Sequence, residues 1–338
     1  MEAPCSEAGE DRGLRENVDS ASNATTEETE TVDEAPPPPS TVVLEEGLNQ
    51  RVAHFLTTLT VEDLKKYNPP SKHHCKTDDD FKLALNKLKA FLSTFVGKEH
   101  GTQRTYRYAR GKDFGRMFCS EGLQNVWRAF RGALCKGLMT DIDMKNCHPV
   151  ILLWICEKFK IDCPKLREYV TDREHHLTEL CKVLRGKGRE HCKRQFLMAT
   201  NTNKKMENVP YPFFNEYQAE IQDVIQPALM GIDELSARFK PHAEQAAKRR
   251  EAGGKEANEE GSFLNLVLCY NENIFLQEAR AFLDSVEIET AVLMLDGLMV
   301  YGDHYKHRGL LLVLHNRLKA KFGIEMHFDF KQHETTVC

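Results

Sequence analysis

The chain has 338 residues, 41% of them hydrophobic, which is enough for one large domain or two ordinary domains with a substantial core. No apolar run reaches the length of a membrane span, so we expect no membrane partner. The acidic N-terminus argues against a cleaved export or mitochondrial signal, so we expect an intracellular protein that is not secreted and whose eleven cysteines are reduced thiols.

The formal net charge of −5 combines two regions of opposite sign. Residues 1–47 carry a net charge of −11, from thirteen acidic and two basic residues, which leaves +6 for residues 48–338. A basic body fits a polyanionic partner such as nucleic acid, although an ordinary solvated surface explains the charge equally well.

The N-terminal part divides into a tail and a helical region. Residues 1–46 contain few large apolar side chains and the run Pro36–Pro39, which predicts a disordered acidic tail. Residues 47–98 contain apolar side chains at helical spacing. We expect helices near Leu48–Leu56, Val61–Tyr67 and Phe81–Phe91.

The strongest pattern of the chain follows a basic and aromatic stretch, Tyr106–Arg116, whose arginines and tyrosines suit contacts with phosphates and bases. An apolar strand at Leu138–Met144 carries Asp141 and Asp143. Their side chains leave the same face, because successive side chains of a strand alternate. Pro149 is predicted to be the first residue of the apolar helix that comes next.

The segment from about Arg173 to Leu197 is predicted to be helical and is strongly basic, with Arg189 and Lys193 one turn apart. Two such cations can hold a triphosphate, although a solvated charged face explains the pattern equally well. Residues 240–261 are charged and almost free of large apolar side chains, which predicts a flexible insertion. A long amphipathic helix is expected at Phe263–Asp284.

The C-terminal part is predicted to contain a β-hairpin. Its strands are Ala291–Leu295 and Leu298–Tyr301, joined by a two-residue turn at Asp296 and Gly297. Asp-Gly is a favoured turn whatever the function, so Asp296 alone is a weak signal. A helix at His304–Phe322 and a strand at Glu325–Phe330 are expected to follow.

Carboxylates at the end of a buried strand require a cation, which makes the acidic residues candidate metal ligands. Two carboxylates from separate strands, Asp143 and Asp296, can hold a pair of divalent ions in the arrangement used for phosphoryl transfer, with Asp141 as a further ligand. Oxygen ligands favour Mg²⁺ or Mn²⁺ over zinc.

Four segments, in order, resemble motifs of family A DNA polymerases. The run Gly115–Val126 is similar to the G-R-L-S-S…L-Q-N-I-P motif that packs along the primer-template duplex, and DIDMKNCHP is similar to the strand with the first catalytic aspartate. Arg189-x-x-x-Lys193, with Phe196-Leu197 and Asn201, resembles the helix that holds the incoming triphosphate. Leu295-Asp296-Gly297 stands at the place of the third motif.

The D-I-D-x-x-N-x-H-P pattern is most similar to the transposon and virophage branch of this family, whose members are often fused to a superfamily 3 helicase. The resemblance implies an α+β right hand with a small antiparallel palm sheet. The palm would comprise residues 99–163 and 262–338, the helical fingers residues 164–261, and a reduced helical thumb residues 47–98.

The resemblance further implies a DNA polymerase or primase-polymerase that uses two Mg²⁺ or Mn²⁺ ions, a DNA primer-template and dNTPs, at a nuclear or viral replication site. A superfamily 3 helicase in trans is a further expected partner. Asp143, Asp296, Arg189 and Lys193 would be catalytic. The residues expected to contact nucleic acid or substrate are Arg116, Gln124, Asn125, Arg128, Arg131, Asn146, His148 and Asn201.

The sequence departs from the family pattern at three places that bear on function. Asn201-Thr202 stands where cellular family A enzymes have Tyr-Gly at the end of the fingers helix. The third motif has one carboxylate, and the glutamate that normally excludes a ribose 2′-hydroxyl has no counterpart after Asp143, where Asn146 or His148 stands. A relative that binds nucleic acid without catalysis therefore stays an alternative. A helical scaffold without a nucleic-acid role is a third, and it predicts no salt-sensitive binding to DNA.

Overall fold

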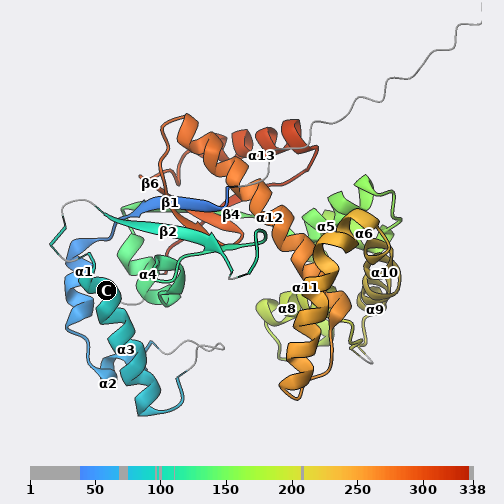
Figure 1. The fold of residues 1–338 in the computed structure, drawn as a ribbon, viewed down its shortest axis with the longest axis horizontal. Coiled ribbons are helices and arrows are strands. Elements are labelled where there is room, and N and C mark those ends of the chain that lie inside the picture. The colour runs from blue at the N-terminus through green and yellow to red at the C-terminus, as the bar shows by residue number, and fades with distance from the viewer. Residues whose placement is uncertain are drawn as a thin grey trace, which may run out of the picture. The chain divides into compact units, whose positions relative to one another are not determined.

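The computed structural model describes residues 39–67, 75–95, 97–98, 101–109, 111–206 and 209–334, which belong to one structural unit, residues 37–338. Residues 1–38, most of the predicted acidic tail, lie outside the described residues. The described part is a mixed α+β fold with small antiparallel sheets, as the sequence predicted (Figure 1).

The strands form two antiparallel sheets. The three-stranded sheet has the order β1-β2-β3, and the four-stranded sheet has the order β5-β6-β4-β7. The first sheet contains β1 (Thr41–Glu46), β2 (Thr102–Tyr108) and β3 (Met117–Phe118). The second contains β4 (Met139–Met144), β5 (Thr290–Met294), β6 (Gly297–Tyr301) and β7 (Phe328–Lys331).

Helices precede, interrupt and follow these strands. Before β2 lie α1 (Gln50–Thr57), α2 (Val61–Lys65) and α3 (Asp78–Ser93). Flanking β4 are the 3₁₀ turn η1 (Leu123–Asn125), α4 (Arg128–Cys135) and α5 (Cys147–Lys158). Next come α6 (Pro164–Thr171), α7 (Arg173–Val183), α8 (Arg189–Asn201), α9 (Pro212–Ala219), the π-helical turn η2 (Glu220–Ile225), α10 (Gln226–Met230) and α11 (Asp233–Ala252). The last are α12 (Glu259–Ser285) and α13 (Arg308–Phe322).

Helices α2 and α3 begin at capping boxes. Thr60 accepts a hydrogen bond from the Asp63 backbone, and the Asp63 side chain accepts one from the Thr60 backbone. Thr77 and Asp80 repeat the arrangement at α3. Each box satisfies two backbone donors that a helix start otherwise leaves unpaired, so the helix boundaries follow from the local sequence.

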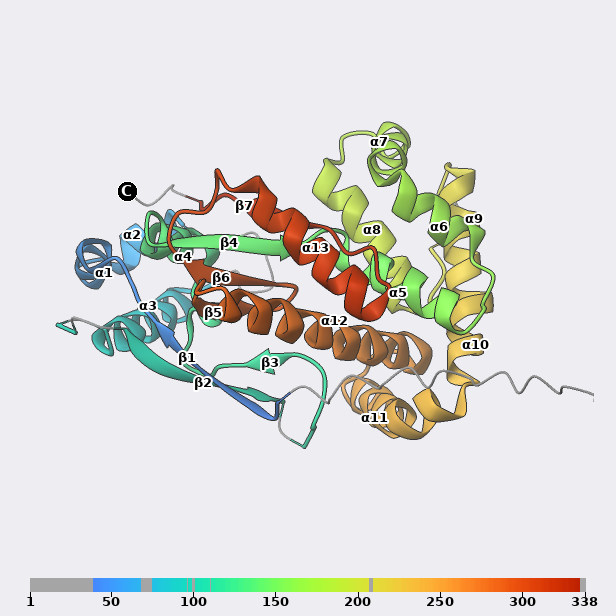
Figure 2. The same cartoon turned by 90° about the horizontal axis from the view of Figure 1, so that it is seen from above.

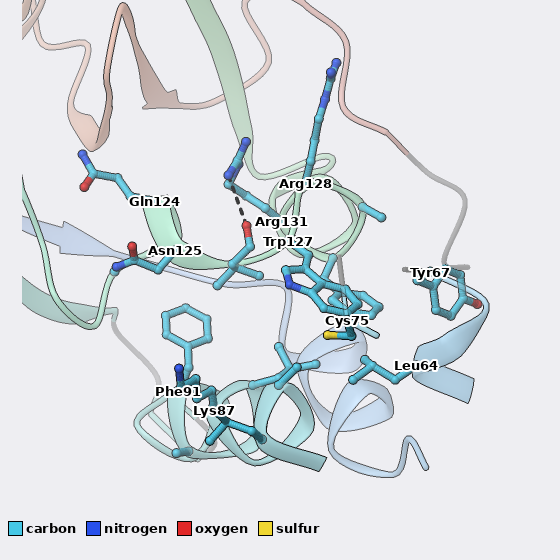
Figure 3. A pocket seen from close by; sticks show the side chains of 18 of the residues that line it. Leu64, Tyr67, Cys75, Lys87, Phe91, Gln124, Asn125, Trp127, Arg128 and Arg131 are labelled. Carbon is cyan, nitrogen blue, oxygen red and sulfur yellow. Dashed lines mark hydrogen bonds between the residues drawn. The ribbon is translucent and has the colours of Figure 1, made fainter. Parts of the chain in front are cut away.

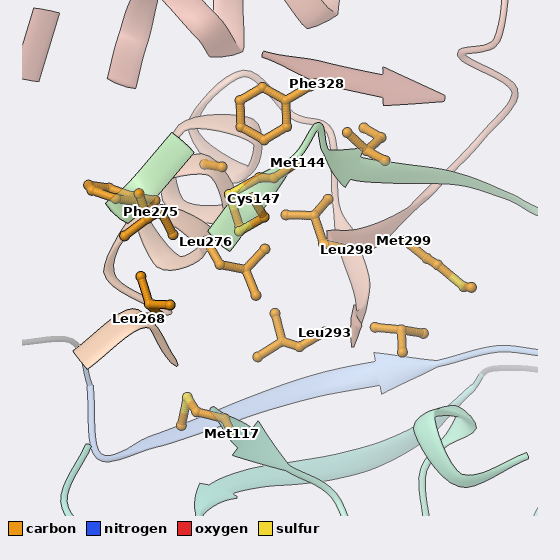
Figure 4. Close-up of a cluster of buried hydrophobic side chains, with 14 of the residues drawn as sticks. Met117, Met144, Cys147, Leu268, Phe275, Leu276, Leu293, Leu298, Met299 and Phe328 are labelled. Atoms are coloured by element: carbon orange, nitrogen blue, oxygen red, sulfur yellow. The ribbon is translucent and has the colours of Figure 1, made fainter. Parts of the chain in front are cut away.

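Helix α12 connects the helical region with the four-stranded sheet. It packs against α8, α10 and α11 near its start, and against α5, α13, β5 and β6 further along (Figure 2). Beside the sheet, Phe275 and Leu276 join an apolar cluster with Met144, Leu293 and Leu298 (Figure 4). This core holds β4, β5 and β6 together at the end where the conspicuous aspartates lie.

Two predicted disordered segments are ordered, which corrects the sequence analysis. Residues 41–46, assigned to the acidic tail, form β1, which pairs with β2 along its whole length and buries Val42 and Leu44. Residues 240–252, assigned to a flexible insertion, continue α11. There Ala243 and Ala247 are buried, and α11 packs against α12, so small side chains form the contact although the segment has few large apolar ones.

Two local boundaries also differ from the prediction. Pro149 is the third residue of α5, which starts at Cys147 after Asn146 in the left-handed conformation. The hairpin turn is Leu295-Asp296, one residue earlier than predicted, because Gly297 already pairs in β6. Leu295 takes the positive φ of 48° that the turn requires.

The last residue of β1, Glu46, is completely buried and links three segments. Its carboxylate accepts hydrogen bonds from the Tyr106 hydroxyl and from the Leu123 backbone, the latter at 2.9 Å. Burial raises the pKa of Glu46, while these hydrogen bonds and the nearby Arg104 act in the opposite direction. The carboxylate therefore joins β1, β2 and η1.

We expect Glu46→Ala to lower the free energy of unfolding by about 3 kcal/mol, because it leaves a buried hydroxyl and a buried backbone N–H without their acceptor. Urea denaturation of the full chain measures this. Glu62→Ala, at a highly exposed carboxylate on α2, is the control and should change stability by less than about 0.5 kcal/mol. Equal effects in the two variants would contradict the role given to Glu46.

Candidate functional site

The structure brings Asp143 and Asp296 together at one end of the four-stranded sheet. Asp143 on β4 lies opposite Gly297 on β6, and the Met144 backbone donates a 2.9 Å hydrogen bond to the Asp296 carbonyl. Asp296 is in the tight turn between β5 and β6, so the hairpin fixes its position relative to β4. Two acidic residues 153 positions apart in the chain thus meet at one end of the sheet, Asp143 on β4 and Asp296 in the turn that precedes β6.

Gly297 is required by this close approach. A Cβ at position 297 would collide with the Asp143 carboxylate and with the Ile142 carbonyl oxygen. The glycine of the Asp-Gly pair is the first residue of β6 and makes room for the side chain of the neighbouring strand.

The two carboxylates form an acidic cluster that one lysine partly neutralises. Burial raises the pKa of Asp296, and the charges of Asp143 and Glu272 raise it further. Lys331 on β7 forms an ion pair with Asp143. Carboxylate oxygens are the ligands that Mg²⁺ and Mn²⁺ prefer, and the charges of these two carboxylates act on one another, so the chemistry of the residues present fits such ions.

Asp141 lies one pleat behind Asp143 on the same face of β4 and is only 7% exposed. Its Oδ1 atom has no hydrogen-bond partner among the described residues. Burial, followed by the charge of Asp143, raises the pKa of Asp141 to about 7. Its protonation therefore changes near neutral pH.

This shift predicts a pH-dependent stability in the absence of divalent ions. Because the folded protein holds the Asp141 proton up to about pH 7 and the unfolded chain only up to about pH 4, stability falls as pH rises through this window. Asparagine at position 141 has no proton to lose in this range, so the Asp141→Asn variant keeps its stability as pH rises. We expect it to be more stable than wild type by roughly 2–4 kcal/mol at pH 8.

Urea denaturation in EDTA at pH 4 and pH 8 measures the difference, which should largely vanish at the lower pH. A variant less stable than wild type at pH 8 would contradict the assignment.

Near the acidic cluster, Arg116, His148 and Glu272 form a hydrogen-bonded network in which His148 and Glu272 are buried and Arg116 is partly exposed. Glu272, on α12, is completely buried and accepts hydrogen bonds from Arg116 Nη2 at 2.7 Å and His148 Nε2 at 2.9 Å. Burial alone would raise the pKa of Glu272, but these hydrogen bonds lower it. Burial lowers the pKa of His148, and contacts with Cys269 and Glu272 outweigh it, raising that pKa to about 9.

The network gives Arg116 a partner within the protein, and its contact with nucleic acid stays a prediction. Its guanidinium group binds a buried carboxylate inside the protein, which makes it a positioning residue for Glu272 and His148. Asn146 precedes this network at the start of α5, and its buried side-chain nitrogen has no hydrogen-bond partner among the described residues.

The side-chain amides of Gln124 and Asn125 stabilise the η1 loop. Gln124 accepts from the Cys119 backbone and donates to the Met117 and Leu293 carbonyls, the latter at 2.6 Å. Asn125 donates to the Cys119 carbonyl at 2.6 Å. These contacts use the side chains to hold the chain beside β5.

Two further predicted cations lie on α4, beside a cavity. Arg128 is largely exposed and pairs with Glu334 at 2.8 Å, whereas Arg131 is half-buried and donates to the Val126 carbonyl. The charges of Asp141 and Asp143 act on Arg131, which places it near the acidic strand.

The cavity, about 1700 Å³, lies between α4 with the η1 loop on one side and α2 with α3 on the other. Figure 3 shows Trp127 on the first wall and Lys87 and Phe91 on the second. Arginine, lysine and aromatic side chains thus line one hollow.

Helix α8 carries Arg189, Lys193 and Asn201. Arg189 forms a two-pronged ion pair with Glu174, and Lys193 is exposed and has no ion-pair partner among the described residues. The Asn201 side chain donates to the Leu197 carbonyl and accepts from Asn265. The charge of Lys145, two residues after Asp143, acts on Glu174, so the start of α8 lies toward the end of β4.

Two residues near the aspartates, Glu272 and Lys331, are not among those predicted from the sequence. Glu272 could have been found from the polar run Asn271-Glu272-Asn273 within an otherwise apolar helix, since buried charges of this kind require partners. Nothing local marked Lys331. Its role appears only when β7 pairs with β4 and sets Asp329 opposite Asp143.

No described helix is both long and apolar enough to cross a membrane. No family model matches the sequence. The chain is 24% identical over 234 residues to the putative helicase V13 of Sputnik virophage, an alignment covering 66% of this chain and 29% of that protein. The chain therefore spans less than a third of the length of this relative.

Among solved structures, the fold is similar to the POL domain of Pol1 from M. smegmatis in complex with a DNA primer-template and dNTP. The match has a TM-score of 0.55 and covers 86% of this chain and 67% of that chain, at 10% sequence identity. At this identity the similarity establishes a polymerase-domain-like fold.

Proposed function

We propose that this chain is a template-directed nucleotidyltransferase, a DNA polymerase or primase-polymerase of mobile-element or viral ancestry that uses two Mg²⁺ or Mn²⁺ ions. The observation that carries the proposal is the placement of Asp143, on β4, beside the turn that holds Asp296, in a fold similar to a polymerase domain. Divalent ions at two such carboxylates would clamp the attacking and leaving oxygens of a phosphoryl transfer.

In this proposal the four-stranded sheet is the palm, within residues 99–163 and 262–338. Residues 164–261, from α6 to α11, are the fingers, and residues 47–98, from α1 to α3, are the thumb. The assignment is supported by chain order, since α8 lies between the two segments that contribute strands to the same sheet.

The residues of the chain have distinct tasks. Asp143 and Asp296 hold the ions, and Asp141 is a second-choice ligand whose raised pKa favours its neutral form when no cation is near. Lys331 neutralises Asp143 in the free protein and is 44% exposed, so its long side chain is able to move aside. Arg116 and Glu272 position His148 through hydrogen bonds.

Lys193 and Arg189 bind the triphosphate from α8. Both are on the solvent-facing side of the helix, together with the exposed apolar side chains of Leu197 and Met198. A cationic and apolar stripe suits a nucleotide, whose phosphates pair with the cations and whose base packs on the aliphatic groups. When the nucleotide binds, Arg189 leaves its surface ion pair with Glu174 and pairs with the phosphates.

Nucleic acid would occupy the cavity between α4 and α3, where Arg128 and Arg131 offer positive charge and Trp127 and Phe91 offer aromatic surface. The partners are thus a DNA primer-template and dNTPs. The similarity to part of a putative virophage helicase supports a viral origin. A superfamily 3 helicase acting in trans and a viral or nuclear replication site are further parts of the proposal.

Primer extension tests the proposal. The full chain, a primed DNA template, dNTPs and Mg²⁺ should give products that depend on the template, and EDTA should abolish them. The alternative, a relative that binds nucleic acid without catalysis, is favoured by the single carboxylate of the third motif. It predicts salt-sensitive DNA binding with no extension in either Mg²⁺ or Mn²⁺.

We expect Lys193→Ala to lower kcat/KM for dNTP by roughly 10²-fold while leaving the Kd for the primer-template nearly unchanged, because it removes one preorganised cation from the triphosphate. Steady-state extension kinetics and a DNA-binding titration measure the two quantities. Lys248→Ala, at an exposed lysine of α11, is the matched control and should resemble wild type. Equal losses in both variants would argue against a specific site on α8.

A further inference from the structure

Three side chains with metal-ligating atoms lie together where α13 turns back toward β7. They are His315 on α13 and Glu325 and His327 on the segment that follows, and one ligand atom of each lies within 4.8 Å of the others. None of the three belongs to the acidic cluster of Asp143 and Asp296. The group has a different chemistry, with two imidazole nitrogens and a single carboxylate.

The local sequence places Glu325 and His327 on one side of the chain. Gly323 ends α13 in the left-handed conformation, and the residues that follow alternate between buried and exposed. Ile324 and Met326 point into the core, so Glu325 and His327 both face outward, next to the last turns of α13.

The orientation of His315 leaves one nitrogen available. Its ring is buried, and Nδ1 lies 3.1 Å from the Met326 carbonyl, to which it donates a hydrogen bond. This contact fixes the tautomer with the lone pair on Nε2, as a backbone carbonyl commonly does for a metal-binding histidine. Nε2 then faces Glu325 Oε2 at 3.4 Å.

The other two ligands are held nearby by separate contacts. Lys319 pairs with the Oε1 atom of Glu325 at 2.5 Å, which leaves Oε2 directed toward His315. The His327 ring stacks on His315 with centroids 4.2 Å apart and an angle of 3° between the planes. The stack keeps a second imidazole within reach of the same point.

We propose that His315, Glu325 and His327 bind one divalent transition-metal ion, with zinc as the ion that best suits this donor set. Two imidazoles and one carboxylate form a common zinc ligand set that leaves a fourth position for water or another ligand. Zinc bonds of about 2.0–2.1 Å place donor atoms roughly 3.3 Å apart. Rotation of the exposed Glu325 and His327 side chains closes the remaining distance around the fixed His315.

An ion at this position would join three parts of the fold. It would connect α13 to the segment leading into β7, and the His327 carbonyl already accepts a 2.8 Å hydrogen bond from the Lys145 backbone at the end of β4. Since an ion that binds only the folded state stabilises it, binding should raise the Tm. The proposal does not depend on polymerase activity.

Titration of the metal-stripped full chain with Co²⁺ and then with Zn²⁺ tests the site. We expect one equivalent of Co²⁺ to bind with the visible absorption bands of tetrahedral coordination, Zn²⁺ to displace it, and Zn²⁺ to raise the Tm. His327→Ala should weaken binding at least tenfold and Glu325→Gln should weaken it less, whereas His54→Ala, at an exposed histidine of α1, should bind as wild type does.

Because Glu325 and His327 are exposed, their substitution leaves the core intact, and circular dichroism verifies the fold of each variant. The proposal is overturned if the wild-type chain shows no tetrahedral Co²⁺ bands, or if His327→Ala binds Co²⁺ as tightly as wild type does. Retention of primer extension by His327→Ala would leave the proposed polymerase function intact whichever result is obtained.

Discussion

Asp143→Asn is expected to lower the rate of primer extension by at least about 10³-fold while leaving DNA affinity within about twofold of wild type. Asparagine keeps the shape of the side chain but loses the negative charge that would hold a divalent ion beside Asp296. The substitution also removes the ion pair with Lys331, which is partly exposed and contributes little to stability. Single-turnover extension and a DNA-binding titration measure the two effects.

Asp296→Asn should show the same loss, and the double variant should be hardly worse than either single one, because the two carboxylates act as one site. Asp329→Asn is the matched control. Asp329 lies directly opposite Asp143 on β7 but is half-exposed and pairs with Arg308, so extension should be retained. Full activity of Asp143→Asn would remove this residue from the mechanism.

Glu272→Gln is expected to lower the free energy of unfolding by about 3–5 kcal/mol. Glu272 is completely buried and is the ion-pair partner of both Arg116 and His148, so the variant leaves the partly buried Arg116 and the buried His148 without their acidic partner. The pKa of His148, about 9 in the presence of Glu272, should fall, because burial then acts without the opposing carboxylate. Urea denaturation gives the stability, and NMR titration of the imidazole gives the pKa.

Glu278→Gln on the same helix provides the comparison. Glu278 also pairs with two cations, Arg317 and Lys321, but both are partly exposed, so water can solvate them after the substitution. We expect a loss of about 1 kcal/mol or less. Comparable losses at the two positions would indicate that Glu272 is an ordinary ion-pair partner.

Local sequence patterns predicted most helices and the central hairpin. Helices α2 and α3 follow from capping residues and apolar spacing, and β5 and β6 follow from β-branched and apolar runs around a turn. Residues 41–46 and 240–252, which the sequence predicted to be disordered, are ordered for one reason. β1 is a short apolar run at the end of a polar tail, and α11 is polar with small buried side chains. Packing against β2 and α12 stabilises them, and composition alone does not reveal such a partner.

The candidate site was also predictable only in part. Asp143 and Asp296 stand out because each interrupts an apolar stretch, and strand pairing accounts for their proximity. Lys331 and Glu272 were not predictable, because the contacts that matter for them join residues far apart in the sequence. The histidines at positions 315 and 327 are twelve residues apart. They meet only because α13 ends at Phe322 and the chain turns back at Gly323.

The central claim is that Asp143 and Asp296 form one binding site for a pair of divalent ions. Electron paramagnetic resonance of Mn²⁺ bound to the full chain, with primer-template and a non-reactive dNTP analogue, tests it most directly. The His327→Ala background keeps the proposed histidine site out of the signal. We predict spin coupling between two bound Mn²⁺ ions that disappears in both Asp143→Asn and Asp296→Asn. Coupling that survives either substitution, or that is absent from the parent chain, would contradict the account.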